Sequence, residues 1–208
     1  MAGHHLHTYL ALGDSYTIGE SLPLYENFPY QAVQLLRKGG FAFSAPEIIA
    51  RTGWTTEELL RAVHSIHFQA PYDMVSLLIG VNNQYRGYPP GEYADEFESI
   101  LQHALSFAGG HKKRVFVLSI PDWGVTPFAA PDRSPKQVSA AIDRFNQLNQ
   151  SIAARHGVHY IDITPGSRLA ATDSSLLAAD KLHYSAKEYA RWAGLLVKGY
   201  PRPHPPTP

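Results

Sequence analysis

The chain contains no cysteine among its 208 residues. This absence excludes a disulfide framework, a thiolate zinc site and a cysteine nucleophile. It leaves the compartment open, because cysteine-free proteins occur on both sides of a membrane.

The chain also lacks a surplus of charge and a long apolar run. Lys+Arg and Asp+Glu both number 18, so the formal net charge is zero, and we expect no binding to nucleic acid. No apolar run approaches the ~20 residues that span a bilayer, so we expect no membrane span. A length of 208 residues suits one domain with a substantial core.

The first residues lack the basic region and long apolar stretch of a signal peptide. We therefore expect a cytoplasmic protein, and secretion is the alternative if a leader was removed. His4, His5 and His7 resemble a metal-binding cluster. We interpret them instead as a disordered terminus or the lead-in to a strand, because terminal residues are rarely held firmly, and we expect no metal.

Five mostly apolar segments are typical of strands that are covered on both faces of a parallel sheet. They are residues 8–13, 47–51, 74–80, 114–120 and 158–163. Helical patterns alternate with them, and this order predicts a three-layer α/β domain with a central parallel sheet. We predict one domain over residues 1–199 and a disordered, proline-rich tail over residues 200–208.

Several helices carry start signals. Capping boxes, in which a Ser or Thr and a Glu or Gln three residues later exchange hydrogen bonds, are predicted to begin at Thr55, Ser134 and Ser185. Asn27 is predicted to start another helix that ends at residues 39–40. Residues 91–110 are predicted to form a further helix.

Polar and aromatic residues follow the predicted strands, where open α/β sheets bind ligands. The first predicted strand is followed by Asp14 and Ser15, and the second is followed by Gly53 and Trp54. The third is followed by Asn82, Asn83, Tyr85 and Arg86, and the fourth by Asp122 and Trp123. Asp180 and His183 come shortly before the last predicted helix.

Ser15 is either a turn residue or a nucleophile, and the choice depends on its partners. A serine hydroxyl needs a base, usually a histidine whose other ring nitrogen contacts a carboxylate. Two residues separate Asp180 from His183, so a turn lets the carboxylate fold back onto the imidazole. We prefer Asp180 to Asp122 as this acid because its spacing to His183 is local. Asp14 is expected to hydrogen-bond the turn.

Three groups are available to stabilise the oxyanion of a tetrahedral intermediate: the N–H of Ser15, the N–H of Gly53 and the side-chain amide of Asn82. Glycine lets the backbone approach a ligand closely, and asparagine donates without adding a charge. The alternative interpretation is that Asn82 and Asn83 are turn residues.

The blocks GDSYTIG, Gly53, GVNN and DKLH occur in the order found in the SGNH hydrolases, also called the GDSL esterase/lipase family. Each block alone is a weak signal, but together and in this order they span nearly the whole folded chain. On that basis the chain resembles this family. The resemblance implies a flavodoxin-like α/β/α fold and ester hydrolysis without a cofactor. It also implies Ser15 as nucleophile, Asp180 and His183 as its partners, and an oxyanion hole made by Ser15, Gly53 and Asn82.

Two positions depart from the family pattern. Asn83 stands where the third block usually has aspartate, so the family pattern does not predict which hydrogen bonds form at this position. Tyr184 follows the histidine where proline is common, and we expect its phenol at the rim of a pocket. The predicted substrate pocket comprises Tyr16, Trp54, Asn83, Tyr85, Arg86, Trp123 and Tyr184, because ligand sites are rich in aromatic residues; the alternative is that the tryptophans and Tyr85 belong to the core.

The pattern predicts a serine hydrolase of carboxylic esters, with short acyl or acetyl groups that are carried on a small molecule or a carbohydrate. Lysophospholipase or thioesterase activity is the alternative within the same family. A non-catalytic α/β binding module is the alternative outside it. A nucleotide-binding role is disfavoured, because the first strand-end loop lacks the small and hydroxyl residues that cradle a phosphate.

Overall fold

The structure of the protein is a computed structural model that describes residues 5–129 and 134–201. Its five strands form one sheet in the order β2-β1-β3-β4-β5, and all neighbouring strands are parallel. The strands are β1 (Tyr9–Gly13), β2 (Glu47–Ala50), β3 (Met74–Leu78), β4 (Val115–Leu118) and β5 (His159–Ile161). This topology confirms the predicted α/β sandwich and its flavodoxin-like strand order.

The strands are shorter than the apolar segments that predict them, chiefly at their carboxyl ends. In β5 the difference arises because the chain leaves the ladder early: the N–H of Ile163 donates to the Ser119 hydroxyl at 2.8 Å instead of to a neighbouring strand. Every residue of β1, β3 and β4 is buried, whereas β2 and β5 at the sheet edges are half-buried. The apolar runs of β1, β3 and β4 therefore correspond to strands covered on both faces, while the two edge strands are only partly covered.

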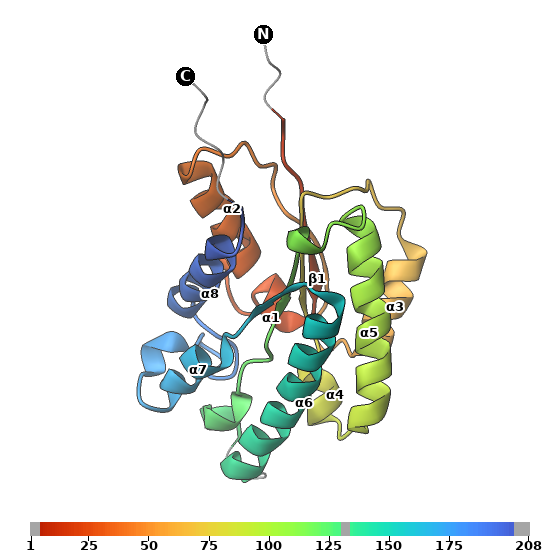
Figure 1. The fold of residues 1–208 in the computed structure, drawn as a ribbon. Coiled ribbons are helices and arrows are strands. Elements are labelled where there is room, and N and C mark those ends of the chain that lie inside the picture. Colours follow the sequence, from red (N-terminus) through yellow and green to blue (C-terminus); the bar gives the residue numbers. More distant parts are fainter. Residues whose placement is uncertain (1–4, 130–133, 202–208) are drawn as a thin grey trace.

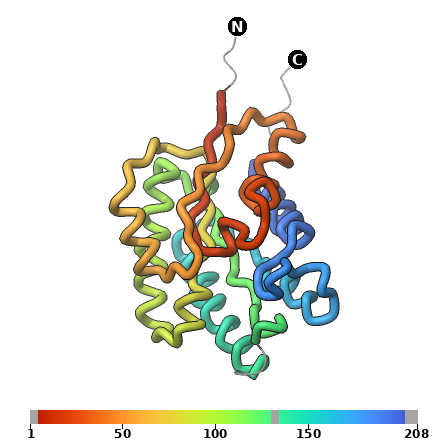
Figure 2. Tube along the Cα trace, turned by 180° about the vertical axis from the view of Figure 1, so that it is seen from behind, coloured from red at the N-terminus to blue at the C-terminus, as the bar shows by residue number. Residues whose placement is uncertain are grey.

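Helices cover both faces of the sheet (Figure 1). The described α-helices are α1 (Ser15–Ile18), α2 (Phe28–Lys38), α3 (Thr56–Ser65), α4 (Val81–Tyr85), α5 (Pro90–Phe107), α6 (Pro135–His156), α7 (Thr164–Ser167) and α8 (Ala186–Lys198). Short 3-10 helices are η1 (Leu24–Glu26), η2 (Lys112–Arg114), η3 (Trp123–Val125), η4 (Pro127–Ala129), η5 (Arg168–Ala171) and η6 (Ser174–Leu176). Helix α2 packs against α8 on one face, and α3 and α6 pack against α5 on the other; Figure 2 shows the same separation from behind.

The strand order places a crevice between β1 and β3, where the connections diverge to opposite faces. Gly13, the last residue of β1, lies beside Ala50 of β2 and Leu78 of β3. Because these three strands end at one level, the segments that follow them meet at one edge of the sheet. Position 13 requires glycine, since a Cβ there would lie 2.0 Å from Thr17 Oγ1 and 2.5 Å from the Leu78 carbonyl oxygen.

Two of the predicted helix starts are confirmed in their hydrogen bonds. Thr55 and Glu58 form the reciprocal capping box of α3, and the Asn27 side chain accepts from the N–H of Tyr30 at 2.9 Å to cap α2. The boxes predicted at Ser134 and Ser185 are wrong, since neither side chain caps its helix.

At the Ser185 box both partners are engaged elsewhere. The Ser185 hydroxyl donates to the Ser175 carbonyl at 2.7 Å. The buried Glu188 carboxylate accepts from Trp192 Nε1 and Arg191 Nη1, both at 2.9 Å. Tertiary partners therefore replace the local pair.

Tyr200, which the sequence assigns to the tail, packs against the domain. Its ring lies 5.3 Å from that of Phe41 and 5.5 Å from that of Phe43, because these two rings offer an apolar surface beside the end of α8. Residues 202–208 of the predicted tail lie outside the described residues.

The caps generate a paired prediction. Thr55→Ala removes a buried cap and should lower the free energy of unfolding by about 1 kcal/mol. Ser134→Ala matches the same sequence motif but removes no cap bond, so it should change stability by less than about 0.5 kcal/mol. Urea denaturation midpoints measure both values. Equal losses in the two variants would contradict the assignment of the cap to Thr55.

Candidate active site

Ser15 lies directly beyond the carboxyl end of β1, as the first residue of α1. The turn is fixed by Asp14, whose side chain accepts from the N–H of Tyr16 at 3.0 Å, and this confirms the expected role of Asp14. The Ser15 N–H belongs to the first turn of a helix, where N–H groups have no partner within the helix. The turn therefore directs both the Ser15 hydroxyl and its N–H to the edge of the sheet.

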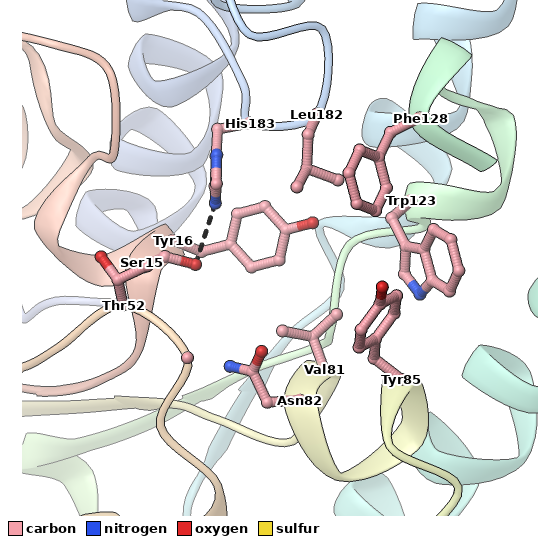
Figure 3. A pocket seen from close by; sticks show the side chains of 11 residues that line it. Ser15, Tyr16, Thr52, Val81, Asn82, Tyr85, Trp123, Phe128, Leu182 and His183 are labelled. Atoms are coloured by element: carbon pink, nitrogen blue, oxygen red, sulfur yellow. Dashed lines mark hydrogen bonds between the residues drawn. The ribbon is translucent and has the colours of Figure 1, made fainter.

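A hydrogen-bonded chain joins Ser15 to residues near the other end of the sequence. His183 Nε2 lies 3.0 Å from Ser15 Oγ, and His183 Nδ1 lies 2.7 Å from Asp180 Oδ2. Figure 3 shows the bond between the serine and the imidazole, both of which line a cavity. In such an arrangement the imidazole can take the serine proton on Nε2 while the carboxylate holds the proton on Nδ1.

Four hydrogen bonds hold the Asp180 carboxylate in its ionised form. Burial by itself raises the pKa of this carboxyl, but hydrogen bonds from the Ser21 hydroxyl, the Leu182 N–H and His183 outweigh burial and hold the pKa well below its usual range. The Ser21 hydroxyl donates to Oδ2 at 2.6 Å, and the N–H groups of Leu182 and His183 each donate to Oδ1 at 2.9 Å. The carboxylate is thus fixed in place and charged beside the imidazole.

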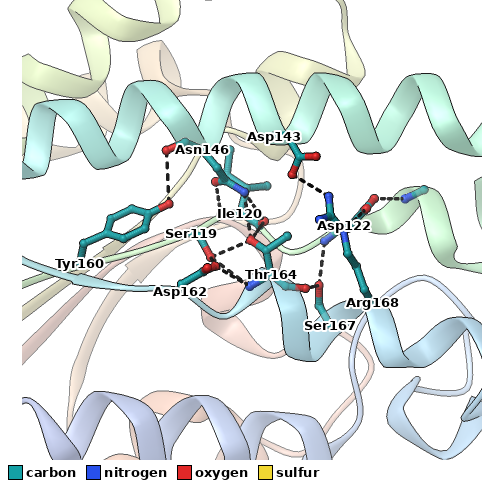
Figure 4. Close-up of polar contacts among 11 residues, drawn as sticks. Ser119, Ile120, Asp122, Asp143, Asn146, Tyr160, Asp162, Thr164, Ser167 and Arg168 are labelled. Atoms are coloured by element: carbon teal, nitrogen blue, oxygen red, sulfur yellow. Dashed lines mark hydrogen bonds and ion pairs between the residues drawn. The ribbon is translucent and has the colours of Figure 1, made fainter.

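Asp122, the alternative acid, lies in a different network (Figure 4). Its side chain is buried and accepts from Arg168 Nε at 2.8 Å and from the Gly124 N–H at 2.9 Å. Arg168 also binds Asp143 at 2.7 Å. Asp122 therefore anchors the segment after β4, whereas Asp180 contacts the histidine.

The three predicted oxyanion donors line the same cavity. Gly53 has a φ of +83°, a left-handed conformation that favours glycine, and Arg86 Nη2 donates to its carbonyl oxygen at 2.6 Å. Asn82 Nδ2 donates one proton to the Trp54 carbonyl oxygen at 2.9 Å. An amide carries two such protons, so this bond orients the amide and leaves the second proton for another acceptor.

The cavity has about 560 Å³ of empty space, part of it open to solvent. Its lining comprises Ser15, Tyr16, Thr52, Gly53, Val81, Asn82, Tyr85, Trp123, Phe128, Leu182 and His183. Beyond Ser15, His183 and the three predicted oxyanion donors the walls are mainly apolar, and the rings of Tyr85, Trp123 and Phe128 lie at one side, as Figure 3 shows. Of the predicted pocket residues, Tyr16, Tyr85 and Trp123 line it.

Four lining residues were not predicted. Thr52, Val81 and Leu182 are the direct neighbours of Gly53, Asn82 and His183 in the sequence, and that adjacency is a signal that could have found them. Phe128 lies in η4, five residues after Trp123, and nothing in the sequence separates it from a core phenylalanine.

The other four predicted pocket residues, all in the described part of the chain, lie outside the cavity lining. For Tyr184 the expected place at the rim is wrong: the side chain is fully buried and its hydroxyl donates to the Asp122 carbonyl at 3.1 Å. Trp54 contributes its backbone carbonyl to orient Asn82. Arg86 supports Gly53 from behind and also pairs with Glu58 at 3.4 Å.

Asn83 is also buried and supports the site from behind. Its Oδ1 accepts from the Thr56 N–H at 3.0 Å, and its Nδ2 donates to the Thr56 hydroxyl at 2.7 Å. Since the amide both donates and accepts here, Asn83 ties α4 to the start of α3 without a buried charge.

The carboxyl of Asp14, beside Ser15, has an unusual pKa. Its Oδ2 is buried and has no hydrogen-bond partner among the described residues. Burial raises the pKa of this carboxyl to about 7, although hydrogen bonds from the N–H of Tyr16 and from its own N–H lower it. The carboxyl of an unfolded chain titrates near 3.9. The folded state therefore holds this proton more tightly than the unfolded state.

The comparisons with known proteins agree with this geometry. A model of the GDSL-like Lipase/Acylhydrolase family matches residues 11–191. The chain belongs to this family, and family membership makes it a carboxylic ester hydrolase. No curated protein sequence matches the chain significantly.

Several solved structures share the fold. TesA is 18% identical, with a TM-score of 0.72 over 93% of this chain and 97% of that one. The esterase EstA from Pseudoalteromonas sp. is 15% identical, with a TM-score of 0.71 over 93% and 96% of the two chains. The acetylxylan esterase Axe2 from Geobacillus stearothermophilus is 17% identical, with a TM-score of 0.69 over 93% of each chain. At these identities the similarity concerns the fold.

The Asp14 carboxyl predicts a pH dependence of stability. Because its folded pKa is raised, the stability that its proton provides is fully present below about pH 4 and is lost as the pH rises through about 7. Asp14→Asn should remove this dependence. Urea midpoints measured from about pH 5 to about pH 8 should therefore fall more steeply in the wild type than in the variant. The exposed Asp95→Asn is the control and should follow the wild type; parallel curves for Asp14→Asn and the wild type would refute the raised pKa.

Proposed function

We propose that this ester hydrolase works through an acyl-enzyme on Ser15. The observation that supports the proposal is the chain of hydrogen bonds, 3.0 Å from Ser15 Oγ to His183 Nε2 and 2.7 Å from His183 Nδ1 to Asp180 Oδ2. Ser15 Oγ attacks the carbonyl carbon of the ester as His183 Nε2 takes its proton. Asp180 keeps the tautomer correct and stabilises the imidazolium that forms.

The negative charge of the tetrahedral intermediate is placed on the former carbonyl oxygen. We assign its stabilisation to the N–H of Ser15, the N–H of Gly53 and the second amide proton of Asn82. As the intermediate collapses, the bond to the leaving alcohol breaks and His183 gives that alcohol its proton. Water then attacks the acyl-enzyme with His183 as base, and the acid leaves as Ser15 regains its proton.

The acyl group is assigned to the apolar side of the cavity, beside Val81, Trp123 and Leu182. These side chains favour hydrocarbon over polar groups, and Phe128 lies beside them on the same side of the cavity. We therefore propose esters with short acyl groups as substrates. Lysophospholipase or thioesterase action would require a longer acyl chain or a thioester in the same cavity.

Acetylated carbohydrate is the second candidate substrate. Tyr85 and Phe128 are 41% and 48% exposed, and their ring centroids lie 6.3 Å apart, so they offer partly open faces on which a sugar can stack. The fold is similar to those of acetylxylan esterases. Arg86 adds little to this candidate, because its guanidinium is engaged with Gly53 and Glu58.

The mechanism predicts a graded loss of activity. Ser15→Ala and His183→Ala should each lower kcat for p-nitrophenyl acetate by about 10⁴- to 10⁶-fold. Asn82→Ala should lower it by roughly 10²- to 10³-fold. The exposed Ser65→Ala should be fully active, and melting temperatures of the Ser15 and His183 variants should stay near the wild-type value. A fully active Asn82→Ala would remove that residue from the oxyanion hole, and normal ligand binding with no turnover in the wild type would favour a binding module.

The cavity predicts a preference in acyl length. For p-nitrophenyl esters, kcat/KM should be highest for short chains, and Phe128→Ala should weaken binding of butyrate more than of acetate, because each buried methylene contributes about 0.8 kcal/mol. Tyr25→Ala, at a ring that is 60% exposed and outside the cavity lining, is the matched control. Highest kcat/KM on long chains would contradict the short-acyl assignment, and faster turnover of acetylated xylan than of every p-nitrophenyl ester would favour the carbohydrate.

A further inference from the structure

The second cluster of chemically active side chains lies at the opposite end of the sheet from the cavity. His5 and His7 precede β1, whereas Ser15 follows it. Asp73 precedes β3 in the same way, and its carboxylate reaches the two histidines. The sequence could not indicate this meeting, because His7 and Asp73 lie 66 positions apart in the sequence and the pairing of β1 with β3 brings them together.

The three side chains present one ligand atom each. His5 Nε2 lies 2.9 Å from Asp73 Oδ2, and His7 Nδ1 lies 3.8 Å from the same oxygen. All three atoms lie within 4.8 Å of one another. Ligands of a tetrahedral zinc ion, each about 2.0 to 2.2 Å from the metal, lie roughly 3.3 to 3.6 Å apart. The observed separations bracket that range, so a rotation of exposed His5 and a shift of a few tenths of an ångström between His7 and Asp73 would form a site.

Two of the three ligands are already held in place. The His7 ring stacks on Phe43 at 5.0 Å, and its backbone bonds Ala42 and pairs with Phe43 in a β-bridge. Asp73 is buried, and the N–H of Thr8 donates to its Oδ2 at 3.0 Å. Such outer partners fix the direction of a ligating group.

Other polar groups surround the cluster. Arg114 Nη1 lies 3.4 Å from Asp73 Oδ1. It therefore pairs with the carboxylate oxygen other than the one beside the two histidines. The Tyr200 hydroxyl lies 3.5 Å from His7 Nδ1, and the Thr8 hydroxyl lies 3.5 Å from Asp73 Oδ2. A simple ion pair explains why His5 lies beside Asp73. It does not explain why His7 also lies near the same carboxylate oxygen.

We propose that His5, His7 and Asp73 form a binding site for a divalent transition metal of the zinc class. Two imidazole nitrogens and one carboxylate oxygen are ligands that zinc accepts, with water completing four-coordination. The bound ion would join the segment before β1 to the start of β3 and thereby stabilise the fold at this edge. This site is independent of ester hydrolysis at Ser15.

The test is a titration of the full chain, free of any added histidine tag, with ZnCl₂ by isothermal calorimetry. We expect one strong site per chain and a melting temperature that rises with zinc concentration, because the metal binds the folded state. His5→Ala, at a side chain that is 66% exposed, should keep the metal-free melting temperature, weaken zinc binding at least tenfold and shift the rise in melting temperature to correspondingly higher zinc concentrations.

His64→Ala is the matched control. His64 and His103 form the other histidine pair in the described chain, with their Nε2 atoms 3.1 Å apart on α3 and α5. Among the described residues no third ligating side chain lies near this pair, so the His64→Ala variant should bind zinc as the wild type does. The proposal is overturned if the wild type binds no zinc, if His5→Ala binds as tightly as the wild type, or if binding is lost with His64→Ala instead.

Discussion

The hydrogen bond between the Ser15 hydroxyl and His183 Nε2 is the contact on which the proposed mechanism of this chain depends. It joins the first strand-end loop to the segment before the last helix, two parts of the sequence that lie 168 residues apart. Each partner is fixed from behind: Asp14 caps the turn that carries Ser15, and Asp180 holds the other nitrogen of the imidazole. The parallel sheet makes this possible because it brings its carboxyl ends to one edge.

A second layer of contacts holds the walls of the cavity. Trp123 Nε1 donates to Gln84 Oε1 at 2.8 Å, which links the segment after β4 to α4. The neighbouring Asp122 is clamped by Arg168, which α6 holds through Asp143. Figure 4 shows this network continuing from Asp122 through Ser167, Thr164 and Ser119 to Asp162, the residue after β5. The apolar face of the cavity is thus built on polar contacts that range from buried, at Trp123 and Gln84, to exposed, at Arg168 and Asp143.

Local and periodic signals in the sequence predict much of this structure. The apolar runs identify all five strands, and the short spacing between Asp180 and His183 identifies a contact that a single turn can make. The position of Gly53 after a strand indicates a backbone N–H close to the ligand edge of the sheet, and Gly53 lines the cavity there. These features depend on few neighbours, so the sequence contains enough information to infer them.

The errors concern side chains whose partners come from distant segments. Tyr184 is buried because the Asp122 carbonyl lies within reach of its hydroxyl, and no pattern near residue 184 indicates that oxygen. The Ser185 hydroxyl does not cap α8, because it donates to the Ser175 carbonyl instead. Phe128 reaches the cavity only through the path of the chain after β4. The meeting of His7 with Asp73 likewise depends on strand pairing rather than on local sequence.

The central claim is that His183 activates the Ser15 hydroxyl as a nucleophile. The most direct measurement is the reaction of the full chain with p-nitrophenyl ethylphosphonate, followed by release of p-nitrophenol and by mass spectrometry of the digested protein. The account predicts one phosphonyl adduct per chain, located on Ser15, and a strongly reduced rate of its formation in His183→Ala. An adduct on another residue, or equal rates in the two proteins, would contradict it.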